Sequence, residues 1–414
     1  MRRAENAFRG RFRLYWKEGK LEEQIRRVKK WRKFVEKITE TTQNRPQSNS
    51  NIAYDNAPLG GRPSCLVPRL SCALYDVLSE KWKCRSGSCQ YEAKICLQIN
   101  DELHRKALPE PANVSYKLLI SIPHTPPAQA PLWKACAATI TARPKRSQVK
   151  FRAANSTKLA VDASCLTPIK DVCTTLKDHK SSRARGMLSF AADHFENDTS
   201  TVVYRDKDDW PDPASRFNFE TSSKSETLAD VLATVCQQLD LTKKRALALM
   251  LAYGLMTFSD SWMSERWSKA DISFFRTRSN DLCYIQPFLS SNMKPRPKKV
   301  PLPQDVVHPL PGLLSLGILL LELETAQRIE DLRTDDDYMD PILRVIDSNT
   351  DFTAALKAAE SRSMSSPKYK EAILACLSIR DWGRDADMNH DHVRRRIYDQ
   401  VLQNLESDLQ DLTA

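Results

Sequence analysis

The sequence predicts an α+β protein with two lobes, in which a small β-rich region precedes a larger helical region. Between residues 92 and 205 the chain has short runs, β-branched or alternating in hydropathy, that end at Pro or Asn, which is typical of strands. After residue 226 the apolar residues recur at three- and four-residue steps, which is typical of helices. A polar stretch over 206–226 separates the two patterns. We therefore expect the strands and the helices to segregate into two layers.

We expect three regions along the 414 residues, namely 1–64, 65–225 and 226–414. The first region begins with a helix over 14–40, similar in spacing to a coiled-coil helix, because apolar residues follow one face and Lys and Arg fill the other. A polar stretch with Pro and Gly predicts a linker over 41–64. The apolar face of the helix is made of Leu21, Ile25, Val28, Trp31, Val35 and Ile38.

This first region also holds most of the charge of the chain. Residues 1–40 contain 14 Lys or Arg and 6 Asp or Glu, a net charge of +8 out of +11 for the whole sequence. A basic helix attracts nucleic acid, anionic lipid and acidic proteins alike, so residues 2–37 are a candidate surface for all three. The residues that we expect to carry this interaction are Arg26, Arg27, Lys29, Lys30, Arg32 and Lys33.

The middle region begins with a predicted helix over 70–82 and continues with strands, interrupted by a second helix over 167–176. Its short runs are rich in β-branched residues and are bounded by turn formers. The predicted strands are Glu92–Ile99, Ser115–Ile122, Ala135–Ala142, Gln148–Ala153, Met187–Ala191 and Thr201–Arg205.

The third region is predicted to be helical, apart from an extended connection over 290–312 that contains six prolines. Thr242, Ser366 with Pro367, and Asp391 are the expected helix starts, because their side chains can cap the first turn. The predicted helices are Thr227–Leu239, Thr242–Phe258, Leu313–Ile329, Asp351–Ser361, Lys368–Ile379 and His392–Leu412.

The number of cysteines and the length of the apolar runs indicate in which cellular compartment we expect the protein. Eleven cysteines are an odd number, and the N-terminus lacks the apolar stretch of a signal peptide. The longest apolar run, 313–321, is far shorter than the roughly 20 residues of a membrane span. We expect reduced thiols, no transmembrane segment, and an intracellular protein that is cytoplasmic or nuclear.

Two groups of residues are candidate metal ligands. The spacing of Cys84, Cys89 and Cys96 invites a zinc interpretation, but zinc needs a fourth ligand and none has suitable spacing. Buried or free thiols are the alternative. His390 and His392 are two residues apart, so on a helix we expect them to diverge and to make a poor metal pair. We expect no bound cofactor.

Three segments, residues 243–275, 314–323 and 369–409, resemble one family. They contain Trp267-Ser268-Lys269-Ala270-Asp271, Leu314-Ser315-Leu316-Gly317 and Tyr369-Lys370-Glu371-Ala372-Ile373. Over about residues 65–414 the chain resembles an uncharacterised family of filamentous-fungal proteins, known as domain of unknown function 7580. The basic first helix resembles the end of a helical region that precedes this domain in other members.

The same segments resemble the helical lobe of a protein kinase. Residues 267–275 stand at the position of the catalytic loop, and 315–323 resemble the buried kinase helix S-x-G-x-x-x-x-E-L. Cys376-Leu377, followed by Asp381 and Arg384, resembles the C-L-x-x-D-P-x-x-R motif that closes the lobe, one residue out of step. The resemblance implies a kinase-like arrangement of a small β-rich lobe and a large helical lobe.

Phosphoryl transfer needs a phosphate cradle and a lysine held by a glutamate. The sequence has no G-x-G-x-x-G and no Walker motif. The helix expected over 167–176 carries no Glu for the lysine. Lys117, Lys134 and Lys150 lie in or beside predicted strands, where we expect them to face solvent. Neither requirement is met by a recognisable motif.

The segment that resembles a catalytic loop also lacks the residue that acts as the base. Glu265-Arg266-Trp267 stands in place of His-Arg-Asp, and an indole cannot accept a proton from a substrate hydroxyl. Asp271 falls near the metal-binding asparagine of a kinase, so it could bind a cation of a nucleotide complex or could cap a turn. No Asp-Phe-Gly follows. We expect Trp262, Trp267, Phe274 and Phe275 to be core residues.

These observations favour a pseudokinase-like interaction or signalling module that is not an enzyme and that binds an unknown protein partner. The first alternative is an atypical metal- or nucleotide-dependent phosphotransferase that uses Asp271 and a lysine of the β-rich lobe. The second is binding of nucleic acid or anionic membrane through the basic helix.

Overall fold

The computed structural model divides the 414 residues into two compact units, residues 1–59 and 60–414. The first unit and the predicted strand 148–153 lie outside the described residues. The helix predicted over 14–40 and its six interaction residues therefore stay predictions. The structure describes residues 66–82, 92–97, 112–122, 132–143, 167–168, 171–172, 174, 188–195, 203–205, 225–234, 239–276, 286–291, 293, 308–338, 344, 346, 349–383 and 386–413.

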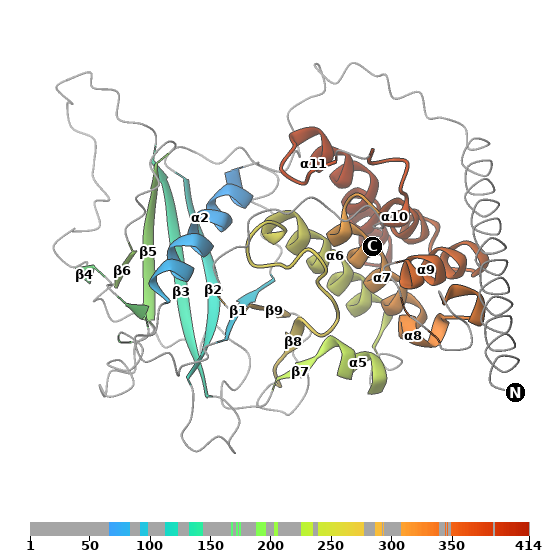
Figure 1. Ribbon diagram of the computed structural model, residues 1–414, viewed down its shortest axis with the longest axis horizontal. Helices are drawn as coiled ribbons and strands as arrows, with labels where there is room; N and C mark the ends of the chain where they lie inside the picture. Colours follow the sequence, from blue (N-terminus) through green and yellow to red (C-terminus); the bar gives the residue numbers. More distant parts are fainter. Residues whose placement is uncertain are drawn as a thin grey trace, which may run out of the picture. The chain divides into compact units, whose positions relative to one another are not determined.

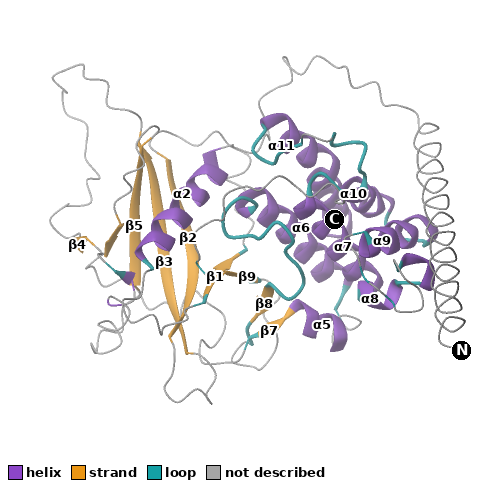
Figure 2. Cartoon of the chain, viewed as in Figure 1, coloured by secondary structure: helices purple, strands orange, loops and turns teal. Residues whose placement is uncertain are grey.

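Strands and helices segregate in the described residues, so the α+β prediction is confirmed (Figures 1 and 2). The strands form one sheet in the order β4-β6-β5-β3-β2-β1-β9-β8-β7, and neighbours are antiparallel except for β3 and β5. The strands are β1 (Ala93–Cys96), β2 (Ala112–Ile122), β3 (Leu132–Arg143), β4 (Thr167–Pro168), β5 (Leu188–Phe195), β6 (Val203–Arg205), β7 (Glu226–Thr227), β8 (Ile272–Phe274) and β9 (Phe288–Ser291).

The sheet runs from the middle region into the third region. β1 pairs with β2 on one side and with β9 on the other, where Cys96 faces Phe288. All four residues of β1 are buried, as expected for a central strand. The last three strands of the sheet thus come from sequence beyond 225, where we predicted helices and an extended connection.

Helix α2 (Leu66–Lys81) confirms the helix predicted over 70–82 and joins the sheet to the helices. It lies against β3 and β5 and also packs on α6 (Leu241–Phe258) (Figure 1). The hydroxyl of Tyr116 on β2 donates to the Val67 carbonyl, at 3.4 Å. The ring of Tyr75 meets that of Trp262 edge to face, with centroids 5.3 Å apart.

The helical part is built around α6 and α7, which are buried on nearly all sides. A helix that is apolar all round belongs in the interior of a domain. α10 and α12 pack against these two central helices. The helices are α5 (Leu228–Thr234), α7 (Pro311–Thr325), α8 (Ile329–Leu332), α9 (Thr350–Ser361), α10 (Pro367–Leu377), α11 (Asp391–Ile397) and α12 (Gln403–Thr413), with a π-helical turn over Tyr398–Leu402.

The structure confirms one of the three predicted helix caps and differs from the other two. α10 is capped as predicted, because the Ser366 hydroxyl accepts from the Tyr369 amide. The prediction for α6 was wrong, since its cap is Asp240, whose carboxylate accepts from the Lys243 amide at 2.7 Å. Asp391 is the first helical residue of α11 and not its cap. The negative charge of Asp391 in the first turn still stabilises α11, because it interacts favourably with the helix dipole.

Two predicted helices were wrong in their extent. Ala326 adopts a left-handed conformation, with φ of 51°, and ends α7, so the predicted helix 313–329 becomes α7 and α8. Thr167 and Pro168 do not start a helix, because they pair with β6 as the edge strand β4. Proline is tolerated at a sheet edge since it does not have to donate a ladder hydrogen bond there.

A buried ion cluster ties the helices together. The guanidinium of Arg245 on α6 contacts the carboxylates of Glu324 on α7, at 2.8 Å, and Asp408 on α12, at 2.5 Å. It also stacks on the ring of Tyr369, with its central carbon 3.5 Å from the centroid. Because the guanidinium is fully buried, it needs these partners to be stable inside the fold.

None of the helices in the described ranges is both long and apolar enough to cross a membrane.

Candidate functional site

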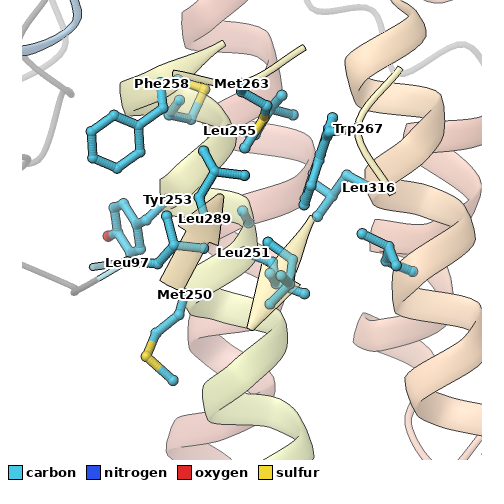
Figure 3. Close-up of a cluster of buried hydrophobic side chains, with 14 of the residues drawn as sticks. Leu97, Met250, Leu251, Tyr253, Leu255, Phe258, Met263, Trp267, Leu289 and Leu316 are labelled. Carbon is cyan, nitrogen blue, oxygen red and sulfur yellow. The ribbon is translucent and has the colours of Figure 1, made fainter. Parts of the chain in front are cut away.

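The loop after α6, residues 259–271, leads into β8 and contains both Trp267 and Asp271. Trp267 is 1% exposed and lies among apolar side chains, including Leu255 and Leu316 (Figure 3). Its indole N–H donates to the Gly312 carbonyl at the start of α7, at 2.9 Å. This hydrogen bond and the packing of the indole therefore hold the loop against α7. The prediction that Trp262, Trp267, Phe274 and Phe275 are core residues is confirmed.

Asp271, the candidate cation ligand, holds the end of this loop. Its carboxylate accepts from the amide of Ser268, at 2.8 Å, and from the Ser268 hydroxyl, at 3.3 Å. Its carbonyl accepts from the amide of Ser290 on β9, at 2.8 Å. These contacts make Asp271 a turn cap directly before β8.

The sheet holds a buried lysine that we did not predict. The ammonium of Lys94 on β1 donates to the Ser273 hydroxyl of β8, at 2.8 Å, to the Ser290 hydroxyl of β9, at 2.7 Å, and to Glu92, at 2.8 Å. It also lies 4.8 Å above the ring of Trp133. Three acceptors use all three of its N–H groups, so the charged form is satisfied inside the sheet.

Burial lowers the pKa of Lys94, while the carboxylates of Glu92 and, more weakly, Asp271 act to raise it. The sequence held a signal for this residue, because Lys94 stands between Ala93 and Ile95 in a short apolar strand. Of the strand lysines that we considered, Lys117 is half-buried, and the side chains of Lys134 and Lys150 lie outside the described residues.

A second lysine crosses from the loop to the helices. Lys269 donates to Glu322 on α7, at 2.5 Å, and to Glu330 on α8, at 2.6 Å. Glu322 also accepts from the amide of Ile329, at 2.7 Å, and so caps α8. Burial raises the pKa of Glu322 against the opposing effect of Lys269. Burial has the largest effect on the pKa of Glu330 and acts to raise it, but the hydrogen bond from Lys269, a backbone hydrogen bond and the charges of Lys269 and Arg333 together outweigh it, so the net shift is downward.

Next to these residues is a cleft of about 270 Å³. Its walls come from the loop, from α7, from α8 and from the start of α9, so that apolar side chains line it beside charged ones. The lining residues are Arg266, Trp267, Ser268, Lys269, His308, Pro311, Leu314, Ser315, Ile318, Leu319, Glu322, Ile329, Glu330, Asn349, Asp351 and Phe352.

His308 is one of the residues that line this cleft, and it is 1% exposed. Its Nδ1 accepts from the Leu310 amide, at 3.1 Å. Burial lowers its pKa to about 4, although the backbone around Leu310, Cys376 and Ser378 acts in the opposite direction. The imidazole is therefore neutral at pH 7, with its proton on Nε2.

The structure bears on both groups of candidate metal ligands, the cysteines and the histidine pair. Cys96 is buried on β1, whereas Cys84 and Cys89 lie outside the described residues. In the part of the chain that the structure describes, no group of three or more potential ligands could hold a metal. The expectation that His390 and His392 diverge was wrong, because their rings stack with centroids 5.4 Å apart. His390 precedes α11 in an extended conformation, so helical spacing does not apply to it.

A search of curated proteins finds no match for this chain. The family model for DUF7580, a domain of unknown function, matches residues 62–412. That match spans the sheet, the helical part and the cleft, and the chain therefore belongs to the DUF7580 family.

Proposed function

We propose that the chain is a protein-kinase-like interaction module that binds a protein partner and catalyses no phosphoryl transfer. The order of elements supports a kinase-like helical lobe, because a long buried helix, α6, leads into a loop and the strand pair β8–β9. The buried helix α7 then follows, with Glu322 in its interior-facing surface. This is the order that the sequence resemblance implies.

The observation that carries the proposal is the role of Trp267. In the sequence resemblance it takes the position of the catalytic aspartate, and in the structure its indole is buried and donates to Gly312. A general base must reach the proton that it removes, and a buried indole has no basic atom to do so. Asp271, the candidate cation ligand of the same loop, already caps the loop through Ser268.

One observation favours the phosphotransferase alternative. Lys94 is a lysine of the sheet, and it lies close enough to Asp271 for the carboxylate to affect its pKa. A nucleotide complex held by this pair would need the ammonium to leave Ser273 and Ser290 for phosphate oxygens. The two proposals therefore differ in whether MgATP changes the contacts of Lys94.

The test is a phosphoryl-transfer assay on the purified full-length chain with radiolabelled MgATP and MnATP, with and without generic protein substrates. The proposal predicts no transfer above the background of a heat-denatured sample. Asp271→Asn is the key variant, because its amide oxygen can still cap the turn. Asp240→Asn, at the capping carboxylate of α6, is its matched control.

Transfer that Asp271→Asn abolishes and Asp240→Asn preserves would overturn the proposal in favour of the phosphotransferase. Transfer that both variants retain would point to a contaminating kinase. A mass-spectrometric search for phosphorylated sites on the chain itself covers self-modification in the same experiment.

A further inference from the structure

The cleft beside Trp267 contains an arrangement suited to a cationic side chain. Glu322 and Glu330 together hold the single ammonium of Lys269. Two carboxylates against one ammonium leave one negative charge at this wall. The lining also carries Asp351, whose charge is balanced by Arg333, and the cation of Arg266, so the excess of negative charge is local to Glu322 and Glu330.

The exposures show which carboxylate of the lining is the most accessible. The side chain of Glu322 is 1% exposed, whereas that of Glu330 is 43% exposed although it already binds Lys269. Asp351 is 37% exposed and is paired with Arg333. Glu330 is therefore the carboxylate with the most remaining capacity to bind an incoming group.

The other walls suit the aliphatic part of a long basic side chain. Leu314 and Ile318 on α7 are only half-buried, and Phe352 of α9 lines the same space. Lys and Arg bury their methylene stems on apolar surface while the charged head meets a carboxylate. A volume of about 270 Å³ has room for one such side chain.

We propose that this cleft docks a segment of a partner protein by receiving one Lys or Arg side chain against Glu330, with its stem between α7 and Phe352. This inference rests on the proposed function and names the chemistry of the partner. Nucleic acid is disfavoured as the occupant, because Glu330 and Asp351 would repel its phosphates. Lys269 acts as an internal competitor, since its own ammonium already uses part of the same negative charge.

The probe is a fluorescein-labelled peptide of Arg-Ala-Leu repeats, titrated with the full-length chain at low salt and followed by fluorescence anisotropy. Peptides with Gln or Glu in place of Arg are the reference probes. We expect the Arg peptide to bind about ten times more tightly than the Gln peptide and the Glu peptide not to bind.

Variants that remove one charge each test whether the peptide binds in the cleft. Glu330→Gln is expected to weaken the Arg peptide about fivefold, and Arg266→Gln, which removes a lining cation, is expected to strengthen it. The matched control is Glu371→Gln, an exposed carboxylate on α10 outside the cleft, with no expected change. Ser315→Phe, on the α7 wall of the cleft, should fill the volume and block the probe, provided that its melting temperature shows a folded protein.

The proposal is overturned if the Arg and Gln peptides bind equally, or if Glu330→Gln and Glu371→Gln weaken binding by the same factor. The second result would indicate attraction to the general surface. Absence of Arg-peptide binding would also reject the cleft as this docking site. None of these results bears on phosphoryl transfer, so failure here is distinguishable from failure of the proposed function.

Discussion

The close contact between α7 and α10 predicts that a side chain added at Gly317 destabilises the protein. A Cβ built at this position lies 2.8 Å from Cys376 Cβ and 3.0 Å from Leu377 Cδ2. Real Cβ contacts of this kind are essentially never shorter than 3.0 Å. Because Cys376 Cβ is fixed to the backbone of α10, the two helices must move apart to admit Ala.

The expected cost of Gly317→Ala follows from two opposing effects. Overpacking a well-packed core costs about 1–3 kcal/mol, while replacing Gly by Ala within a helix gains about 0.5–1 kcal/mol. We expect a net loss of roughly 1–2 kcal/mol in the free energy of unfolding. Urea unfolding of the full-length chain, followed by tryptophan fluorescence, measures this loss.

Gly254→Ala is the matched control within α6. Its nearest neighbour is Leu97 Cδ2, at 3.0 Å, which is the end of a flexible side chain that can move aside. We expect this variant to be as stable as the wild type or more stable by up to about 1 kcal/mol. Gly317→Ala with unchanged stability, or equal losses in both variants, would refute the packing argument.

Three further predictions concern other buried or capping groups. Arg245→Met should destabilise the protein by about 3–5 kcal/mol, because Glu324 and Asp408 lose their buried partner, whereas Arg344→Met at an exposed ion pair should cost less than about 1 kcal/mol in the same urea titration. The folded pKa of His308 is about 4 against 6.5 for the free side chain, so its contribution is complete above pH 6.5 and is lost as the pH falls from 6.5 to 4, by roughly 3 kcal/mol in total. His308→Asn should remove that part of the pH dependence of the unfolding free energy, and an unchanged pH profile would contradict it. Ser366→Ala should cost about 1 kcal/mol through loss of the α10 cap, measured as a lower melting temperature.

Local periodicity predicted most of the helices and the strands of the middle region, because burial along one element leaves a repeating pattern. It did not predict that β7, β8 and β9 extend the sheet, since these strands have two to four residues and pair across long stretches of sequence. The end of α7 at Ala326 was missed for a related reason. An Ala in the left-handed conformation carries no Gly or Asn signal, and the cap of α8 comes from Glu322 through a tertiary contact.

The candidate site was predictable only in part. Trp267 was correctly expected in the core, together with Trp262, Phe274 and Phe275. The burial of Lys94 depends on Ser273 and Ser290, which lie 179 and 196 residues away in sequence. The cleft depends in the same way on α7, α8 and α9 meeting the loop. Such convergence of distant residues leaves no local pattern in the sequence.

Nucleotide binding is the property that separates the interaction module from an enzyme most directly. The measurement is thermal unfolding of the full-length chain with and without excess MgATP, MgGTP and MnATP. A ligand at a hundred times its dissociation constant stabilises the folded state by about 2.7 kcal/mol, which raises the melting temperature by several degrees. We predict no shift with any of the three nucleotides. A clear shift that Asp271→Asn or Lys94→Met abolishes would contradict the account and would support a working nucleotide site.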